Sequence, residues 1–116
     1  MATKMLETAL RRHGDVAILD LTGEIDGFAD EVLNAAYAAA EQTAPRAILL
    51  NFKGVDYINS TGIALIVGLL AQARRAGRKL LTCHLGPHYT EIFQITRLAD
   101  FMSLYPDEAS ALAQDS

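Results

Sequence analysis

A short polar segment between two apolar runs holds the residues of this chain best suited to chemistry. Ser60 and Thr61 carry hydroxyl groups, and they follow the apolar run 47–52 and precede the apolar run 63–73. This order predicts a strand, a turn and a helix, so both hydroxyls should lie at a helix N-terminus. Free N–H groups and the helix dipole favour an anion there. We therefore interpret Ser60 as a candidate phosphorylation site, with Thr61 as the second candidate.

An ordinary structural role competes with modification at Ser60. Serine is a preferred N-cap residue, and on spacing alone capping is the more common role; Asn59 or Thr61 could share it. A nucleophilic serine is disfavoured because the sequence has no Gly-x-Ser-x-Gly turn and no base that can be paired with Ser60. We predict no catalytic residue.

The remaining reactive side chains predict neither a metal site nor a cofactor. His84 and His88 are four residues apart, but Gly86-Pro87 lies between them, so they do not share a continuous helix face. The single cysteine, Cys83, cannot form an internal disulfide, and no zinc-binding spacing is present. The glycines match neither a Walker loop nor a Rossmann fingerprint.

Composition narrows the classes of function. The 116 residues favour one domain, 1–116, and a hydrophobic content of 51% is enough for a core. A net charge of −4 and a pI of about 5.2 argue against nucleic-acid binding. The run 63–73 is too short to cross a bilayer, so no membrane insertion is expected. Without a visible secretory signal, we expect a cytoplasmic protein.

The hydrophobic pattern predicts the element order β-β-α-β-α-β-α-β-α. An antiparallel N-terminal hairpin and the β-α-β repeats then predict an α/β fold with a mixed sheet and about four helices. The expected strands are 5–12, 16–22, 46–52, 79–84 and 101–105. Turns are expected at 13–15 and 23–27. The first helix is expected to follow Asp26 as its N-cap, and the second to span 60–76. The third is expected to begin at Gly86-Pro87, and the fourth to run from Pro106 to about Gln114.

Two helices bear on a binding surface. The first should place Phe28, Val32, Ala36 and Ala40 on one stripe, which Leu33 and Tyr37 widen. The second is apolar nearly all round between residues 63 and 71, although a helix covering a sheet should have a polar outer side. Either another helix covers it or an apolar patch lies exposed beside Ser60, and such patches commonly mark protein partners.

Three motifs of the sequence have counterparts in one protein family. The segment 22–26, Thr-Gly-Glu-Ile-Asp, is similar to the family's early Gly-Glu-Leu/Ile-Asp turn. The segment 57–63, Tyr-Ile-Asn-Ser-Thr-Gly-Ile, resembles its Asp-Ser-Ser/Thr-Gly-Leu segment. The segment 93–98, Phe-Gln-Ile-Thr-Arg-Leu, is similar to its Phe-Asp-Ile-Thr-Gly-Leu stretch. Together the three motifs resemble the STAS domain of bacterial anti-sigma factor antagonists, and the resemblance covers roughly residues 16–113.

The resemblance implies a partner switch without enzymatic activity. Family members capture a serine kinase that also acts as an anti-sigma factor, and this frees the sigma factor. The kinase phosphorylates the motif's serine, which corresponds to Ser60, and the complex dissociates. A PP2C-type phosphatase restores the unmodified form. The protein itself is expected to be a monomer or a weak homodimer.

We expect the partner surface to combine two turns that follow strands and lead into helices. Parallel strands end at the same edge of a sheet, which should bring these turns together. Phe28 is either the apolar anchor of this surface or a core residue. The predicted partner-binding residues are Asp26, Gly27, Phe28, Asn59, Ser60, Thr61, Gly62 and Ile63.

Two positions depart from the family pattern. Asn59 replaces the acidic residue before the serine, and Arg97 replaces the usual glycine. Asn59 supports an alternative, in which the chain is a constitutive, unphosphorylated STAS subunit of a stressosome-like or lipid-transport complex. A third hypothesis is a small serine hydrolase, which the missing base disfavours.

Overall fold

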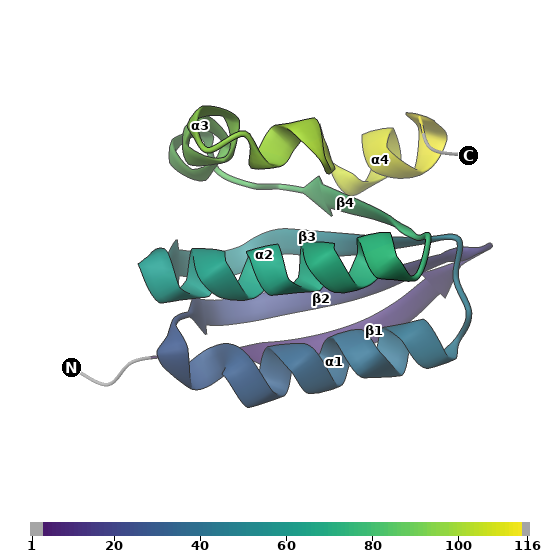
Figure 1. Ribbon diagram of the computed structural model, residues 1–116, viewed down its shortest axis with the longest axis horizontal. Coiled ribbons are helices and arrows are strands. Elements are labelled where there is room, and N and C mark those ends of the chain that lie inside the picture. The colour runs from purple at the N-terminus through teal and green to yellow at the C-terminus, as the bar shows by residue number, and fades with distance from the viewer. Residues whose placement is uncertain (1–3, 115–116) are drawn as a thin grey trace.

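The computed structural model describes residues 4–114. Within this range five strands form one sheet, and four α-helices and two short 3₁₀ segments pack around it (Figure 1). The strands are β1 (Glu7–His13), β2 (Val16–Ile25), β3 (Ala47–Ile58), β4 (Lys79–Cys83) and β5 (Ser103–Tyr105). The helices are α1 (Asp30–Gln42), α2 (Ser60–Arg75), α3 (Pro87–Ile95) and α4 (Glu108–Gln114), and the 3₁₀ segments are Gly27–Ala29 and Leu98–Asp100.

The strand order in the sheet follows the chain, from β1 to β5. β1 and β2 are antiparallel, and every later neighbouring pair is parallel. The predicted α/β fold with a mixed sheet and an N-terminal hairpin is therefore confirmed. β2 and β3 are almost wholly apolar over their first halves because both faces of these central strands are covered. β1 is a charged edge strand, which protects its unpaired side from association.

The two faces of the sheet carry different covers. α1 and α2 lie side by side over one face (Figure 1), and with α3 they bury the main core. The opposite face of β2, β3 and β4 is covered by α4, whose Ala111 is fully buried against it. Because alternate residues of a strand point to opposite faces, the apolar runs of β2 and β3 serve both cores.

Both strands that lead to the predicted site are longer than the sequence pattern indicates. β2 continues through Ile25, so the predicted turn 23–27 is wrong in its first three residues. β3 continues through Ile58, so residues 53–58 are strand and not part of the polar turn. The register pairs Glu24 with Tyr57 and Ile25 with Ile58. Because β2 and β3 pair with each other, both strands extend beyond their apolar runs. The register of this pairing is irregular after Asp20 and after Gly23.

The start of the first helix also differs from prediction. Asp26 caps the 3₁₀ segment Gly27–Ala29, and α1 proper begins only at Asp30. A 3₁₀ turn has about 3.0 residues per turn instead of 3.6, so a residue in it leaves the stripe of the following helix. Phe28 is consequently 84% exposed, whereas Leu33, Tyr37 and Ala40 are buried. Its assignment to the buried stripe is wrong.

Later elements end within one or two residues of the predicted bounds. β4 stops at Cys83, and β5 begins at Ser103, so Phe101 and Met102 precede the strand. Pro87 occupies the first turn of α3, as predicted. Arg97 lies between α3 and the second 3₁₀ segment with a left-handed backbone, φ 69°. Glycine adopts this conformation without a Cβ penalty, which gives a backbone reason for the glycine that the family motif carries there.

We expect Arg97→Gly to stabilise the fold by about 0.5–1 kcal/mol, because it removes the left-handed strain of a residue with a Cβ. The gain is reduced by loss of the exposed ion pair between Arg97 Nε and Asp100 Oδ2, 2.6 Å apart. Urea denaturation checks this, with Arg97→Ala as the matched control: that variant loses the same ion pair and keeps the strain. Equal or lower stability of Arg97→Gly relative to Arg97→Ala would contradict the explanation.

Candidate partner-binding site

The two predicted turns meet at one edge of the sheet. The backbone N–H of Asn59 donates to the carbonyl of Ile25, with 3.2 Å between N and O. Gly62 packs so closely on the same carbonyl that a Cβ built on it would lie 2.0 Å from the oxygen. A Cβ built on Gly27 would lie 3.6 Å from Cγ2 of Thr61. The start of α2 therefore rests directly on the end of β2, as the parallel topology predicts.

Asn59, and not Ser60, caps α2. Its Oδ1 accepts a hydrogen bond from the N–H of Gly62 at 2.8 Å, and its backbone is extended. Ser60 is the first residue of the helix and is exposed. Among the described residues, no hydrogen-bond partner is found for the Ser60 hydroxyl. Capping therefore does not explain Ser60, and its hydroxyl is open to solvent.

Phe28 and Met5 form an exposed apolar patch on the neighbouring turn. They are 84% and 70% exposed, and together with Leu6, Asp26 and Val32 they line a hollow of about 160 Å³. Asp26 fixes the turn because its Oδ1 accepts from the N–H of Phe28 at 3.0 Å. Sequence reasoning missed Met5, which was placed in a strand but precedes β1. An apolar residue two positions before an edge strand was the only available signal.

The surroundings of Ser60 were compared with what a serine nucleophile requires. A serine nucleophile needs a base within hydrogen-bond reach. His84 lines the same small hollow as Ile58, two residues before Ser60, but among the described residues no base is hydrogen-bonded to the Ser60 hydroxyl. No group of three or more potential metal ligands occurs in residues 4–114. The serine-hydrolase hypothesis gains no support from this geometry.

The exposed side of α2 is apolar, which agrees with the second of the two alternatives that the sequence left open, an exposed apolar patch beside Ser60. Ala64, Val67, Gly68 and Ala71 are exposed in the middle of the helix. The buried side consists of Gly62, Ile66, Leu69, Leu70 and Ala73. No helix of the described residues is long and apolar enough to cross a membrane. The two turns and this helix side form one surface, which we call the Ser60 surface: residues 26–28, 59–61, 63, 64, 67, 68 and 71. Gly62, which was predicted to bind the partner, is buried against Ile25 and is not part of it.

A family model described as the STAS domain matches residues 7–111. The chain belongs to the STAS family. It is 31% identical to BtrV of Bordetella bronchiseptica, provisionally named an anti-sigma factor antagonist, over 86 residues, 74% of this chain and 72% of that protein. It is 24% identical to the anti-sigma F factor antagonist of Paenibacillus polymyxa over 110 residues, 94% of each chain.

The fold of this STAS domain matches solved structures as well. The Bacillus cell fate determinant SpoIIAA in its phosphorylated form superposes with a TM-score of 0.72 at 22% identity. The superposition covers 95% of this chain and 100% of that one. At this level of identity the match concerns the fold.

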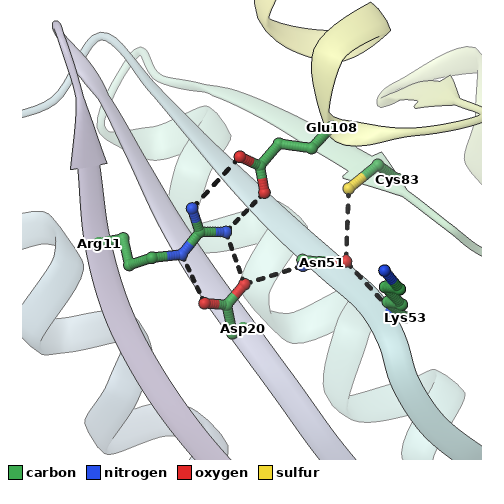
Figure 2. A network of polar contacts seen from close by, with 6 residues as sticks. All are labelled: Arg11, Asp20, Asn51, Lys53, Cys83 and Glu108. Carbon is green, nitrogen blue, oxygen red and sulfur yellow. Dashed lines mark hydrogen bonds and ion pairs between the residues drawn. The ribbon is translucent and has the colours of Figure 1, made fainter.

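The main side-chain polar network of this STAS domain lies away from the Ser60 surface, on the sheet face that α4 covers (Figure 2). Arg11 of β1 binds Asp20 through Nε and Nη2 at 2.6 and 2.8 Å. It also binds Glu108 of α4 through Nη2 and Nη1 at 2.5 and 3.2 Å. Asn51 Nδ2 donates to Asp20 at 2.8 Å. The network ties the C-terminal helix to the opposite edge strand.

Cys83 lies at one end of this network, and its thiol is not reactive. Its Sγ lies 3.6 Å from Oδ1 of Asn51, and its side chain is fully buried. Burial raises the pKa of the Cys83 thiol to about 11. The thiol therefore stays protonated at neutral pH and is a poor nucleophile.

Acid should weaken the attachment of α4. Hydrogen bonds from Arg11 lower the pKa of Asp20 and Glu108 below their ordinary values of 3.8 and 4.5. Groups with a depressed folded pKa stabilise the fold fully above about pH 5, and this contribution is lost as the pH falls through the folded pKa. We expect Glu108→Gln to reduce the loss of unfolding free energy between pH 7 and pH 3 by about 1 kcal/mol.

Urea titrations at a series of pH values measure this loss. The matched control is Glu91→Gln, an exposed glutamate of α3 outside the network. If Glu108→Gln and the unchanged protein lose the same unfolding free energy between pH 7 and pH 3, protonation of the network does not contribute to the loss.

Proposed function

We propose that this STAS domain binds a serine-kinase anti-sigma factor through the Ser60 surface and that phosphorylation of Ser60 releases this partner. The proposal rests on the different roles of two neighbouring residues at the start of α2. Asn59 takes the capping role, while the neighbouring Ser60 hydroxyl is exposed and has no structural task that we can identify. The names of the relatives support an anti-sigma factor as partner.

The composition of the surface fits a protein partner. Phe28 offers a large apolar side chain almost wholly in solvent, and aromatic residues in such positions commonly supply much of the binding energy. The adjoining side of α2 carries no charge between Ala64 and Ala71. A surface of this kind favours a dry contact with another protein over catalysis.

The same position also suits the switch. A phosphate on Ser60 would lie at the positive end of α2, next to the free N–H groups of its first turn. It would stabilise the helix start and leave the fold intact. Its charge, about −1.5 to −2, would enter a contact that needs desolvation. A PP2C-type phosphatase would restore binding. The phosphorylated SpoIIAA structure supports a phosphorylated state for this fold.

Mass spectrometry tests the modification. We expect incubation with the cognate kinase and ATP to add one phosphate to the tryptic peptide 54–74, and fragmentation to place it on Ser60. Thr61 is the neighbouring hydroxyl and serves as the internal comparison. If a kinase shown to bind leaves the peptide unmodified, or modifies Thr61 alone, the proposal is wrong.

Asn59 offers a matched pair of variants for the role of charge before the serine. Asn59→Asp keeps an N-cap of equal quality and restores the family's acidic residue, whereas Asn59→Ala removes the cap at a cost of about 1 kcal/mol. The rate of phosphate transfer in Asn59→Asp, compared with the unchanged protein, measures the effect of charge with the helix start intact.

Asn59 also favours a second candidate function, a constitutive STAS subunit of a stressosome-like or lipid-transport complex. In that case the chain should co-purify with a transporter ATPase or with other STAS proteins and not with a kinase. Binding to such a complex should be the same in Ser60→Ala and Ser60→Asp. A loss of binding in Ser60→Asp alone would exclude the constitutive role.

A further inference from the structure

A cationic hollow lies beyond the last turn of α2, at the end of this helix that points away from the Ser60 surface. It has a volume of about 360 Å³, and its walls come from the end of α2, the start of β4 and the segment before β5. Arg74, Arg78 and Lys79 line it. Among the described residues that line it, only Asp100 is acidic, and Arg97 binds that carboxylate at 2.6 Å. The hollow therefore carries an excess of positive charge in a chain whose net charge is −4.

Two of these cations differ in how far the fold already uses them. Arg78 donates through Nη1 to the carbonyl of Pro45, and its Nε lies 3.9 Å from Oε1 of Glu41, so its charge is partly balanced. Arg74 is exposed, and among the described residues no hydrogen bond or ion pair is found for its guanidinium. The N–H groups of Arg74 are therefore available to a ligand.

Phe101 holds the Arg74 guanidinium in place at the rim of the hollow. The guanidinium carbon lies over the Phe101 ring, 4.9 Å from its centre. A guanidinium bound to an aromatic ring by its face keeps the N–H groups at its edge available, and its fixed orientation reduces the entropy lost on binding. A carboxylate matches such an edge with two parallel hydrogen bonds. Arg74 is therefore arranged to bind a carboxylate.

The end of α2 does not need the Arg74 side chain to satisfy its backbone. Three carbonyls of the last turn, those of residues 72–74, accept the backbone N–H groups of residues 76–78 at distances of 2.9–3.2 Å. Gly77, with a left-handed φ of 71°, permits this closure. The helix dipole favours a cation at this end, but it does not require one that lies on an aromatic ring above a hollow.

An apolar groove joins the hollow to the Ser60 surface. It has a volume of about 280 Å³ and shares Arg74 and Phe101 with the hollow. Its other end reaches Val67 and Ala71, which belong to the Ser60 surface. Between residues 61 and 73, α2 carries no charged side chain. A protein lying along α2 would therefore meet an uncharged, mainly apolar stretch first and then, about 21 Å from Ser60 along the helix axis, a cationic hollow.

We propose that this hollow binds an aspartate or glutamate side chain from an acidic segment of the protein that occupies the Ser60 surface, with Arg74 and Lys79 contacting the carboxylate. The identity of this partner rests on the proposed function, whereas the carboxylate site does not. Asp26 gives the opposite end of the Ser60 surface a negative charge, so the two ends differ in sign. Charge complementarity then fixes the direction in which the partner lies along α2.

The shape of the site favours a protein segment over other polyanions. Nucleic acids and anionic membranes present negative charge over a broad area and are bound by broad basic faces. This chain is acidic overall, and its cations converge on a concave site of about 360 Å³. A concavity of this size admits a side chain but not the flat surface of a bilayer.

A nuclear magnetic resonance titration tests the carboxylate site without a kinase. The probe is a hexaglutamate peptide with blocked ends, and hexaglutamine is the uncharged comparison. We expect hexaglutamate to shift the backbone amide signals of residues 74–79 and 99–103, with half-saturation on the order of 1 mM. Arg74→Gln should weaken this binding about tenfold, the effect of one charge-assisted contact. Lys53→Gln, which removes an exposed charge of β3, is the matched control and should leave it unchanged.

Three results of this titration would overturn the proposal. The first is equal binding of hexaglutamate by Arg74→Gln and the unchanged chain, or equal shifts with hexaglutamine. The second is inorganic phosphate shifting the same signals at a lower concentration than hexaglutamate. The third is co-sedimentation with phosphatidylglycerol vesicles that Arg74→Gln abolishes, because the hollow would then bind a membrane surface.

Binding to the kinase tests the identity of the partner. We expect Arg74→Gln to weaken kinase binding about tenfold, mainly through slower association with a smaller dependence on salt, and Lys53→Gln to leave it unchanged. Phe28→Ala, measured in parallel, reports on the Ser60 surface itself. A loss in Phe28→Ala without a loss in Arg74→Gln would overturn the role of the hollow and leave the proposed function standing. A loss in neither variant would overturn both.

Discussion

Gly62→Ala should destabilise this STAS domain by about 3 kcal/mol, the upper part of the range for overpacking a close contact. A methyl group on Gly62 would lie 2.0 Å from the carbonyl oxygen of Ile25 and 3.0 Å from Cγ2 of Ile58. The first obstacle is backbone held in the sheet, so α2 must move. That movement would strain two hydrogen bonds, Gly62 N–H to Asn59 Oδ1 and Asn59 N–H to the Ile25 carbonyl.

Gly68→Ala is the matched control for Gly62→Ala. Both substitutions replace a glycine of α2 with alanine, but a Cβ on Gly68 would meet no atom within 4 Å. We expect Gly68→Ala to stabilise the domain by about 0.5–1 kcal/mol, because alanine is the better helix former. Urea denaturation measures the unfolding free energy of both variants. Equal effects of the two variants would contradict the contact between α2 and β2 described here.

The close contact at Gly62 also explains how far the sequence could predict the site. The prediction that the two turns lie together followed from parallel topology alone and is confirmed by the contact of Gly62 with Ile25. The length of the strands was not predictable from the local pattern. Residues 53–57 show no clear alternation of apolar and polar side chains. They form a strand because they pair with β2. Long-range pairing of this kind leaves little trace in a local window.

Side-chain roles were less predictable than positions. Asn59, Ser60 and Thr61 are all suitable caps, and only the observed backbone assigns the role to Asn59. Phe28 matched a helical stripe in the sequence, but the 3₁₀ turn that Asp26 caps turns its side chain into solvent. In both cases the residue at which the α-helix begins decides whether a side chain is structural or available for binding.

Because Phe28 and Ser60 are both exposed on one surface, phosphorylation of Ser60 should weaken kinase binding. We expect the Ser60 phosphoprotein to bind the kinase about 150-fold more weakly than the unmodified protein, which corresponds to about 3 kcal/mol. The phosphate charge would have to be desolvated within an apolar contact, and such a charge without a partner costs several kcal/mol. Isothermal titration calorimetry of both forms against the kinase measures the difference, and circular dichroism should show an unchanged fold.

Substitutions separate loss of the hydroxyl from gain of charge and locate the contact. Ser60→Ala should bind the kinase as well as the unmodified protein and remain bound with ATP, whereas Ser60→Asp, with less charge and fewer acceptor oxygens, should weaken binding only in part.

Phe28→Ala should cost about 2 kcal/mol, or about 30-fold, if this side chain is a central anchor. Ile95→Ala removes an apolar side chain of α3 that is 71% exposed and should change nothing. Equal losses for Phe28→Ala and Ile95→Ala, or tight binding of the phosphoprotein, would show that the kinase uses another surface and that Ser60 does not control it.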